Sequence, residues 1–143
     1  MKQARPIAFL MALCMAACAR TPDGQAIRES IEKGVAAAQA HDASALTDVL
    51  ADDFIGNNEL DKAGLKSQLR GQFVVAKAIG VRIGPVDVEV RGDRATARFE
   101  AFVTDTSGRW IPDRAATLHF ETGWRRDGKS WLCNNANWSG DSR

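Results

Sequence analysis

Apolar side chains in the first half of the chain recur every three or four residues, the spacing of one face of an α-helix. The recurrence runs from about Gly24 to about Ala40, and it starts again after Asp42 and after Asp61. Aspartate is a favoured N-cap because its carboxylate accepts a backbone N–H of the first turn. The pattern therefore predicts three helices, whose apolar stripes are Ile27, Ile31, Val35 and Ala38; Leu46, Val49 and Leu50; and Leu65, Leu69, Phe73 and Ala76.

From Ile79 onward the period changes to two, which is typical of strands. The alternation predicts four strands, over residues 79–90, 95–103, 114–126 and 130–138. Hairpin turns are expected in the short polar, glycine-containing segments between them, at 91–93, 105–108 and 126–129. Gly84-Pro85 indicates a bend, and residues 52–58 fit neither period, so an irregular connection is expected there. Helices followed by hairpin-connected strands predict an α+β domain with a four-stranded antiparallel sheet.

Residues 1–18 have the composition of an export signal. Lys2 and Arg5 precede an uncharged apolar run, Ile7–Ala17, that is too short to span a bilayer. Small residues then precede Cys18, an order that resembles the signal of bacterial lipoproteins. The resemblance implies cleavage before Cys18, lipid on its sulfur, a tether over 18–23 and a domain over 24–139. The alternative is an ordinary secretory signal with an incidental cysteine.

The same resemblance implies a location. In well-studied bacteria, a lipoprotein with Ala rather than Asp after the lipid-bearing cysteine is exported onward, so Ala19 implies the outer membrane, facing the periplasm. Retention at the inner membrane stays open, because the sorting rule varies between bacteria. Stable anchoring needs two or three acyl chains, because one chain binds only marginally.

Charge and cysteine content limit the partners. The chain from Cys18 on has 17 basic and 18 acidic residues, a balance that argues against a nucleic-acid partner. The whole chain is 45% hydrophobic and 26% charged, which is typical of a soluble domain with its own core. After cleavage and lipidation only Cys133 keeps a thiol, so no internal disulfide is expected. Cys133 lies in a strand-like run and is expected to be a buried small side chain rather than a reactive thiol.

The order of motifs resembles the nuclear-transport-factor-two-like (NTF2-like) superfamily, which includes the ketosteroid isomerases. The resemblance rests on the segments Asp42–Phe54, Val90–Ala97, Trp124–Trp131 and Ala136–Trp138, and covers residues 24–139. It implies a strongly curved antiparallel sheet wrapped around helices, forming a cone with a pocket at its wide end. Members include isomerases, dehydratases, cyclases, transport factors and non-catalytic modules, so the fold alone does not decide the function.

Few residues suit the catalytic chemistry of that superfamily. Its ketosteroid isomerases use a tyrosine in the oxyanion hole, and this chain has no tyrosine. His41 follows the first helix, where a histidine suits the helix dipole, and the strand parity of His119 places it on the outer face. Asp53 is the best available pocket acid, although the alternative is a solvated turn. No metal-ligand spacing and no phosphate-binding loop occur, so neither a metal nor a cofactor is expected.

Aromatic side chains supply the candidate pocket. Strand and helix parity predicts that five of them point inward and cluster between helices and sheet: Phe54, Phe73, Phe99, Phe120 and Trp124. Such a cluster either fills the cone as core or lines a cavity for an apolar ligand. The first interpretation is favoured here.

Three functions follow from these patterns. The leading hypothesis is a lipid-anchored, non-catalytic binding or interaction module of the cell envelope, with a small apolar ligand as a possible partner. The first alternative is an isomerase, dehydratase or hydrolase with Asp53 as base and His119 or Asn135 as its hydrogen-bond partner. The second is a homodimeric subunit that pairs through the sheet.

Overall fold

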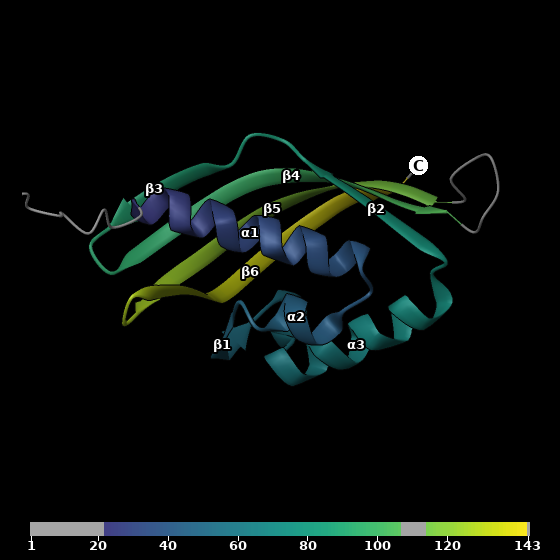
Figure 1. Cartoon of the computed structure of the whole chain (residues 1–143), viewed down its shortest axis with the longest axis horizontal. Coiled ribbons are helices and arrows are strands. Elements are labelled where there is room, and N and C mark those ends of the chain that lie inside the picture. Colours follow the sequence, from purple (N-terminus) through teal and green to yellow (C-terminus); the bar gives the residue numbers. More distant parts are fainter. Residues whose placement is uncertain (1–21, 107–113, 143) are drawn as a thin grey trace, which may run out of the picture.

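Three α-helices form the first half of the fold, as the apolar spacing predicts. In the computed structural model, which describes residues 22–106 and 114–142, they are α1 (Asp23–Gln39), α2 (Ala43–Thr47) and α3 (Lys62–Val75) (Figure 1). The carboxylates of Asp42 and Asp61 cap α2 and α3, accepting the Ala45 and Gly64 amides at 2.9 and 2.7 Å. The predicted caps are therefore confirmed, although α2 ends before the expected Val49 and Leu50.

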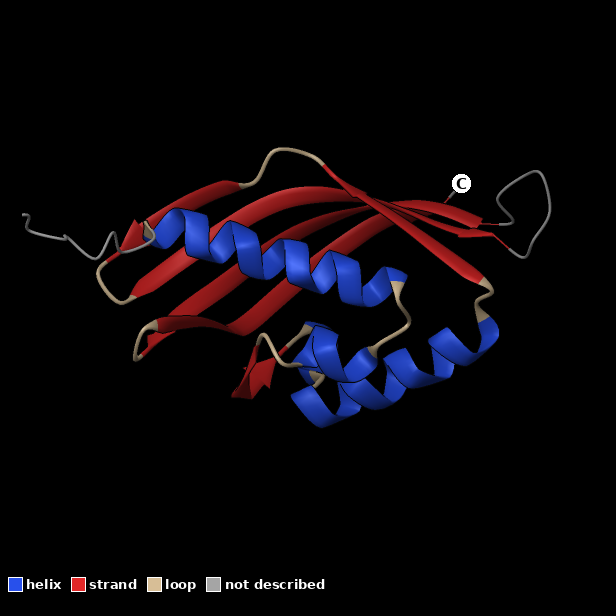
Figure 2. Cartoon of the chain, in the orientation of Figure 1, coloured by secondary structure: helices blue, strands red, loops and turns tan. Residues whose placement is uncertain are grey.

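Six strands form a single sheet (Figure 2). They are β1 (Leu50–Ile55), β2 (Ala78–Ile83), β3 (Asp87–Arg91), β4 (Arg94–Thr106), β5 (Arg114–Asp127) and β6 (Ser130–Ser142). Their order is β1-β6-β5-β4-β2, and β3 also pairs with β4. Two of the predicted hairpin turns contain a glycine at φ +60°, Gly92 and Gly128, a conformation that costs glycine little.

The predicted four-stranded antiparallel sheet is wrong in two details. Residues 50–55, expected to be partly helix and partly irregular, form β1, which pairs with β6 in parallel. The predicted first strand is divided at Gly84-Pro85 into β2 and β3, which pair with the two halves of β4. A bend was expected there, because proline has no N–H to donate to the ladder. The fold is α+β with a mixed sheet.

Some predictions lie outside the described residues. Residues 1–21 contain the expected signal, the expected lipid-bearing Cys18 and most of the expected tether, and residues 107–113 contain Trp110. Among the helices that are described, none has the length and apolar character needed to cross a membrane.

The hydrophobic core lies where the first half of α1 packs on the concave face of the sheet. Ile27 and Ala97 are fully buried at this contact. The remaining core residues come from α1, β1 and the long strands, and they are Ile31, Leu50, Phe54, Ala95, Trp124, Trp131, Cys133 and Ala136. Small inward side chains on β4 and β6 let the helix approach the strands closely.

The start of α1 is also fixed by a polar contact. Asp23 accepts hydrogen bonds from the Arg126 guanidinium at 2.6 Å and from the Trp131 indole N–H at 3.2 Å. The guanidinium lies over the Trp131 ring, 4.7 Å from its centre. This contact joins the first turn of α1 to the β5–β6 hairpin at one end of the sheet.

Helix α3 is held differently from α1. None of its residues is buried, and its main contacts are with α2 and β1 rather than with the long strands. Figure 1 shows α3 on the far side of α1 and α2 from much of the sheet. Helix α3 is therefore not packed tightly against the long strands.

A side-chain bridge joins the segment after β1 to β6. The Asn57 amide donates to the Trp138 carbonyl at 2.6 Å, and its oxygen accepts the Trp138 N–H at 3.1 Å. A single asparagine thus satisfies both backbone groups of one β6 residue. This bridge fixes a position of the strand that lies beside the interior space.

We predict that Asn57→Ala lowers the free energy of unfolding by about 1–3 kcal/mol, because it leaves two partly buried backbone groups without partners. Asn137→Ala is the matched control, since Asn137 is exposed and lies beside Trp138 on β6. Chemical denaturation of both variants measures the difference. Equal stability of the two variants would contradict the bridging role.

Candidate functional site

A cavity of about 450 Å³ lies between the helices and the concave face of the sheet. Its walls come from the second half of α1, from α2, from the inner stripe of α3 and from strands β1, β2, β4, β5 and β6. This volume is within the range of small-molecule sites, roughly 300–1,000 Å³. The cone therefore contains a cavity beside its packed core, and the interpretation of the aromatic cluster as pure core stays a prediction that Phe99→Ala tests.

All five predicted aromatic side chains line this cavity: Phe54, Phe73, Phe99, Phe120 and Trp124. Phe99 stacks on Phe120 with ring centres 5.0 Å apart, and Phe120 lies 6.2 Å from Trp138. Trp138 also lines the cavity but was not among the predicted residues. Its parity with Ala136 on β6 would have identified it.

Polar groups are few in this cavity and are mostly satisfied. The buried Thr122 hydroxyl donates to the Ala97 carbonyl at 3.1 Å and accepts the Trp124 indole N–H at 2.8 Å. Gln68 and Gln72 are exposed residues of α3 that contribute to the wall. The other residues of the wall are apolar, with Ser30 and Cys133 as exceptions.

Cys133 is the one titratable side chain among the described residues of the cavity wall. Its thiol donates to the Asn135 carbonyl at 3.2 Å. Burial raises the pKa of the thiol to about 12, because the thiolate would lose its hydration. The thiol is thus protonated at neutral pH and cannot serve there as a base or a nucleophile.

Asp53, the expected pocket acid, does not line the cavity. Its carboxylate is exposed and accepts two hydrogen bonds from the Arg125 guanidinium, at 2.8 and 2.9 Å. These bonds hold the pKa of the Asp53 carboxyl below its usual value. A carboxylate so engaged is a weak base, and it is separated from the apolar cavity.

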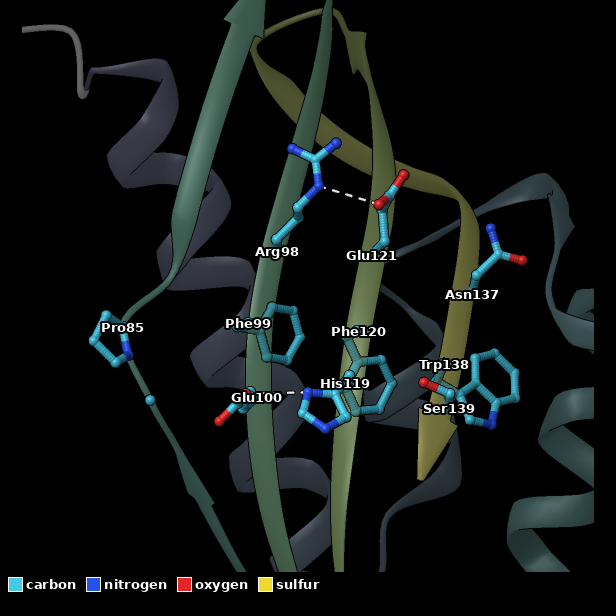
Figure 3. A pocket seen from close by; sticks show the side chains of 11 residues that line it. Pro85, Arg98, Phe99, Glu100, His119, Phe120, Glu121, Asn137, Trp138 and Ser139 are labelled. Carbon is cyan, nitrogen blue, oxygen red and sulfur yellow. Dashed lines mark hydrogen bonds and ion pairs between the residues drawn. The ribbon is translucent and has the colours of Figure 1, made fainter. Parts of the chain in front are cut away.

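His119 lies on the outer face of the sheet, in an open hollow of about 640 Å³ (Figure 3). Its Nδ1 is 3.1 Å from a Glu100 oxygen, and Arg98 donates to Glu121 at 3.1 Å on the same face. All four side chains are at least half exposed, so water and salt screen both pairs. The hollow combines these charged pairs with Phe99, Phe120 and Trp138, which also line the interior cavity.

Asn135 completes the predicted catalytic set but does not approach it. Its side chain is exposed, lies over Gly123 and donates to Asn134 at 3.2 Å. None of Asp53, His119 and Asn135 is on the cavity wall, and each of them contacts a residue outside this set.

Within the described part of the chain, two buried side-chain atoms off the cavity wall have no hydrogen-bond partner, His41 Nε2 and Asp105 Oδ1. His41 follows the C-cap residue of α1, Ala40, at φ +56°, and its backbone N–H donates to the Ala38 carbonyl at 3.1 Å. Its ring stacks on Phe73, 5.6 Å away. His41 therefore supports a wall residue. Within residues 22–106 and 114–142, no group of three His, Cys, Asp or Glu residues could hold a metal ion.

Comparison with known proteins identifies the fold. No family model and no curated protein matches the sequence. An NTF2-like protein with a cystatin-like fold from Novosphingobium aromaticivorans is similar in structure, with a TM-score of 0.67, 24% identity, and coverage of 81% of this chain and 80% of that one. A candidate scytalone dehydratase from the same organism is similar with a TM-score of 0.75 and 11% identity, over 84% of this chain and 85% of that one. An NTF2-like protein of unknown function from Pseudomonas putida is similar with a TM-score of 0.69 and 18% identity, over 82% of this chain and 84% of that one. The chain has the NTF2-like fold.

We predict that Phe99→Ala lowers the free energy of unfolding by only about 1–2 kcal/mol, because one side of the ring already faces empty space. Phe54→Ala is the comparison, since Phe54 is 1% exposed and its loss should cost about 3–5 kcal/mol. Thermal and chemical denaturation measure both. An equal, large loss in the two variants would mean that the cone is filled.

We predict that the Cys133 thiol in the folded protein reacts with iodoacetamide at pH 8 at least about 30-fold more slowly than in the unfolded chain. Its raised pKa also means that the rate keeps rising with each pH unit up to pH 10, since about pH 12 is needed for half ionisation. Mass spectrometry of a chain that begins at Ala19 follows this single thiol. A rate that levels off near pH 9 in the folded protein would contradict the assigned environment.

Proposed function

We propose that this protein is a binding module that holds a small, uncharged, apolar molecule in the cone, anchored by lipid to the bacterial envelope. The observation that carries the ligand part is the cavity itself. It has the volume of a small-molecule site, and apolar side chains form nearly all of its wall.

The absence of ionised groups from the described wall supports an uncharged ligand. A charged group transferred into such surroundings would lose its hydration without gaining a partner, which is strongly unfavourable. Conversely, an apolar molecule gains about 25 cal/mol for each Å² of surface removed from water. Flat or chain-like hydrocarbons suit a wall of aromatic and branched side chains.

The same wall argues against catalysis in the cavity. Isomerases and dehydratases need at least one positioned acid or base at the reacting atom. Here the one titratable wall group, Cys133, stays protonated, and the acids and histidines occupy the outer face or the periphery. Similarity to a candidate dehydratase supports the scaffold and not the reaction.

The outer face of the sheet supports the dimer alternative only weakly. Its centre carries the Arg98–Glu121 and Glu100–His119 pairs, and Phe102, at 47% exposed, is the large apolar residue beside them. A stable interface between copies normally has a contiguous apolar centre. Such a centre is not seen among the described residues of this face.

The envelope part of the proposal rests on the sequence of residues 1–19. Lys2 and Arg5, the apolar run Ile7–Ala17, the small residues before Cys18 and the alanine after it together resemble a lipoprotein signal. The resemblance supports lipid on Cys18 and an outer-membrane location facing the periplasm.

Native mass spectrometry tests both parts of the proposal at once. The protein is expressed in full in a bacterium and purified from membranes in mild detergent. We expect an amino terminus at Cys18 with added acyl mass, together with a non-covalent apolar molecule that organic solvent releases. Cys18→Ala should abolish the acyl mass but leave the retained molecule.

Each part can fail separately. An unlipidated amino terminus at another residue would overturn the anchor, and the absence of any retained or exchangeable apolar molecule would overturn the binding role. Asp53→Asn is the control for the enzyme alternative, because the binding proposal expects it to leave ligand content unchanged.

A further inference from the structure

Helix α3 and the residues just after it form a basic segment. Residues 62–77 contain four basic and no acidic side chains. The chain from Cys18 on has 17 basic and 18 acidic residues, so without this segment it would have 13 against 18. Positive charge is therefore concentrated on one helix of an otherwise acidic domain.

Three of these four cations are free to meet a partner. Lys62 is engaged, because its ammonium donates to the Leu50 carbonyl at 3.1 Å and lies 3.5 Å from Asp52. Lys66, Arg70 and Lys77 have no ion-pair partner among the described residues. Lys66 and Arg70 are four residues apart, so they share one flank of the helix.

An exposed apolar side chain lies beside this flank. Val74 follows Arg70 by another four residues and is 86% exposed. Val75, on the opposite flank of the helix, is 81% exposed. The other exposed large hydrophobic residues in the described chain are at most 47% exposed. The other outward-facing residues of α3 near Arg70 and Val74 have small side chains: Ala63, Ser67 and Gly71.

We propose that the outer side of α3 is a docking surface for an anionic lipid bilayer. Lys66, Arg70 and Lys77 would contact headgroup phosphates while Val74, on the same side of the helix as Arg70, enters the apolar boundary. Cations beside an exposed apolar side chain match the anionic headgroups and the apolar boundary of such a bilayer. A second copy of this chain is a poorer occupant, because two such surfaces repel each other.

Helix α3 borders both the proposed docking surface and the apolar cavity. The inner stripe of the helix, Leu65, Leu69 and Phe73, lines the apolar cavity. The same helix thus separates the cavity from the proposed bilayer contact, and a small displacement would let an apolar molecule pass between them. This consequence rests on the proposed ligand-binding function, whereas the docking itself does not.

Vesicle co-sedimentation tests the docking with a chain that begins at Ala19 and so cannot carry the lipid anchor. Its core residues lie between Ile27 and Ala136, entirely inside this chain, and a cooperative thermal transition verifies that it folds. We expect it to bind vesicles of equal parts phosphatidylcholine and phosphatidylglycerol at low salt. Binding should be lost in molar salt and on vesicles of phosphatidylcholine alone.

Two charge variants locate the surface. Lys66→Gln combined with Arg70→Gln should weaken vesicle binding about 30-fold. Lys33→Gln combined with Lys129→Gln removes the same charge from two exposed sites outside α3 and should change it little. A solvatochromic dye can be attached to Val74→Cys alone, because Cys133 is buried. The emission of this dye should shift to the blue when the mixed vesicles are added.

Several results would overturn the proposal. The chain could fail to bind the mixed vesicles, both double variants could weaken binding equally, or binding could be independent of lipid charge. A change of oligomeric state caused by Lys66→Gln and Arg70→Gln, without a change in vesicle binding, would identify a protein interface instead. None of these results alters the ligand content seen by native mass spectrometry, so the two proposals fail independently.

Discussion

The contact between α1 and the concave face of the sheet determines the form of the molecule. At one end Ile27 meets Ala97, both fully buried, and Asp23 holds the helix to Arg126 and Trp131 of the β5–β6 hairpin. The far end of α1 stays beside the edge of the sheet, where the Gln39 side-chain oxygen accepts the Val81 N–H of β2 at 3.3 Å. The cavity lies between α1, α2, α3 and the inward faces of the strands.

Charged side chains lie on the outer face of the sheet and not on the described wall of the cavity. The ionised side chains nearest the sheet are on its outer face, where they form exposed pairs such as Arg98 with Glu121. The described wall of the cavity contains no ionised group, and its one thiol is held protonated by burial. The interior therefore favours uncharged molecules, while the charged pairs stay hydrated on the outer surface.

Local sequence signals predicted much of the fold. The aspartate caps of α2 and α3 and the glycines of two hairpin turns were found because each depends on a few neighbouring residues. The short strand β1 was missed because Asp52 and Asp53 interrupt its apolar pattern. Its pairing is also non-local, since Leu50 lies opposite Cys133.

The candidate site was predicted only in part, for a similar reason. Strand parity correctly placed Phe99 and Phe120 on the inward face, and it placed His119 on the outer face. Parity says which way a side chain points but not how far away the opposite wall lies. The distance of α3 from the sheet depends on its contacts with α2 and β1, so a filled and a hollow cone have the same periodicity.

A hollow apolar cone is the central claim, and binding of N-phenyl-1-naphthylamine, a neutral fluorophore, tests it most directly. The account predicts saturable binding of one molecule per chain with a blue-shifted emission, weakened by Leu69→Trp, which places a larger ring in the cavity. Val90→Trp, at an exposed strand position, should leave the binding unchanged. Absence of saturable binding, or equal binding by Leu69→Trp and the unmodified chain, would contradict the claim.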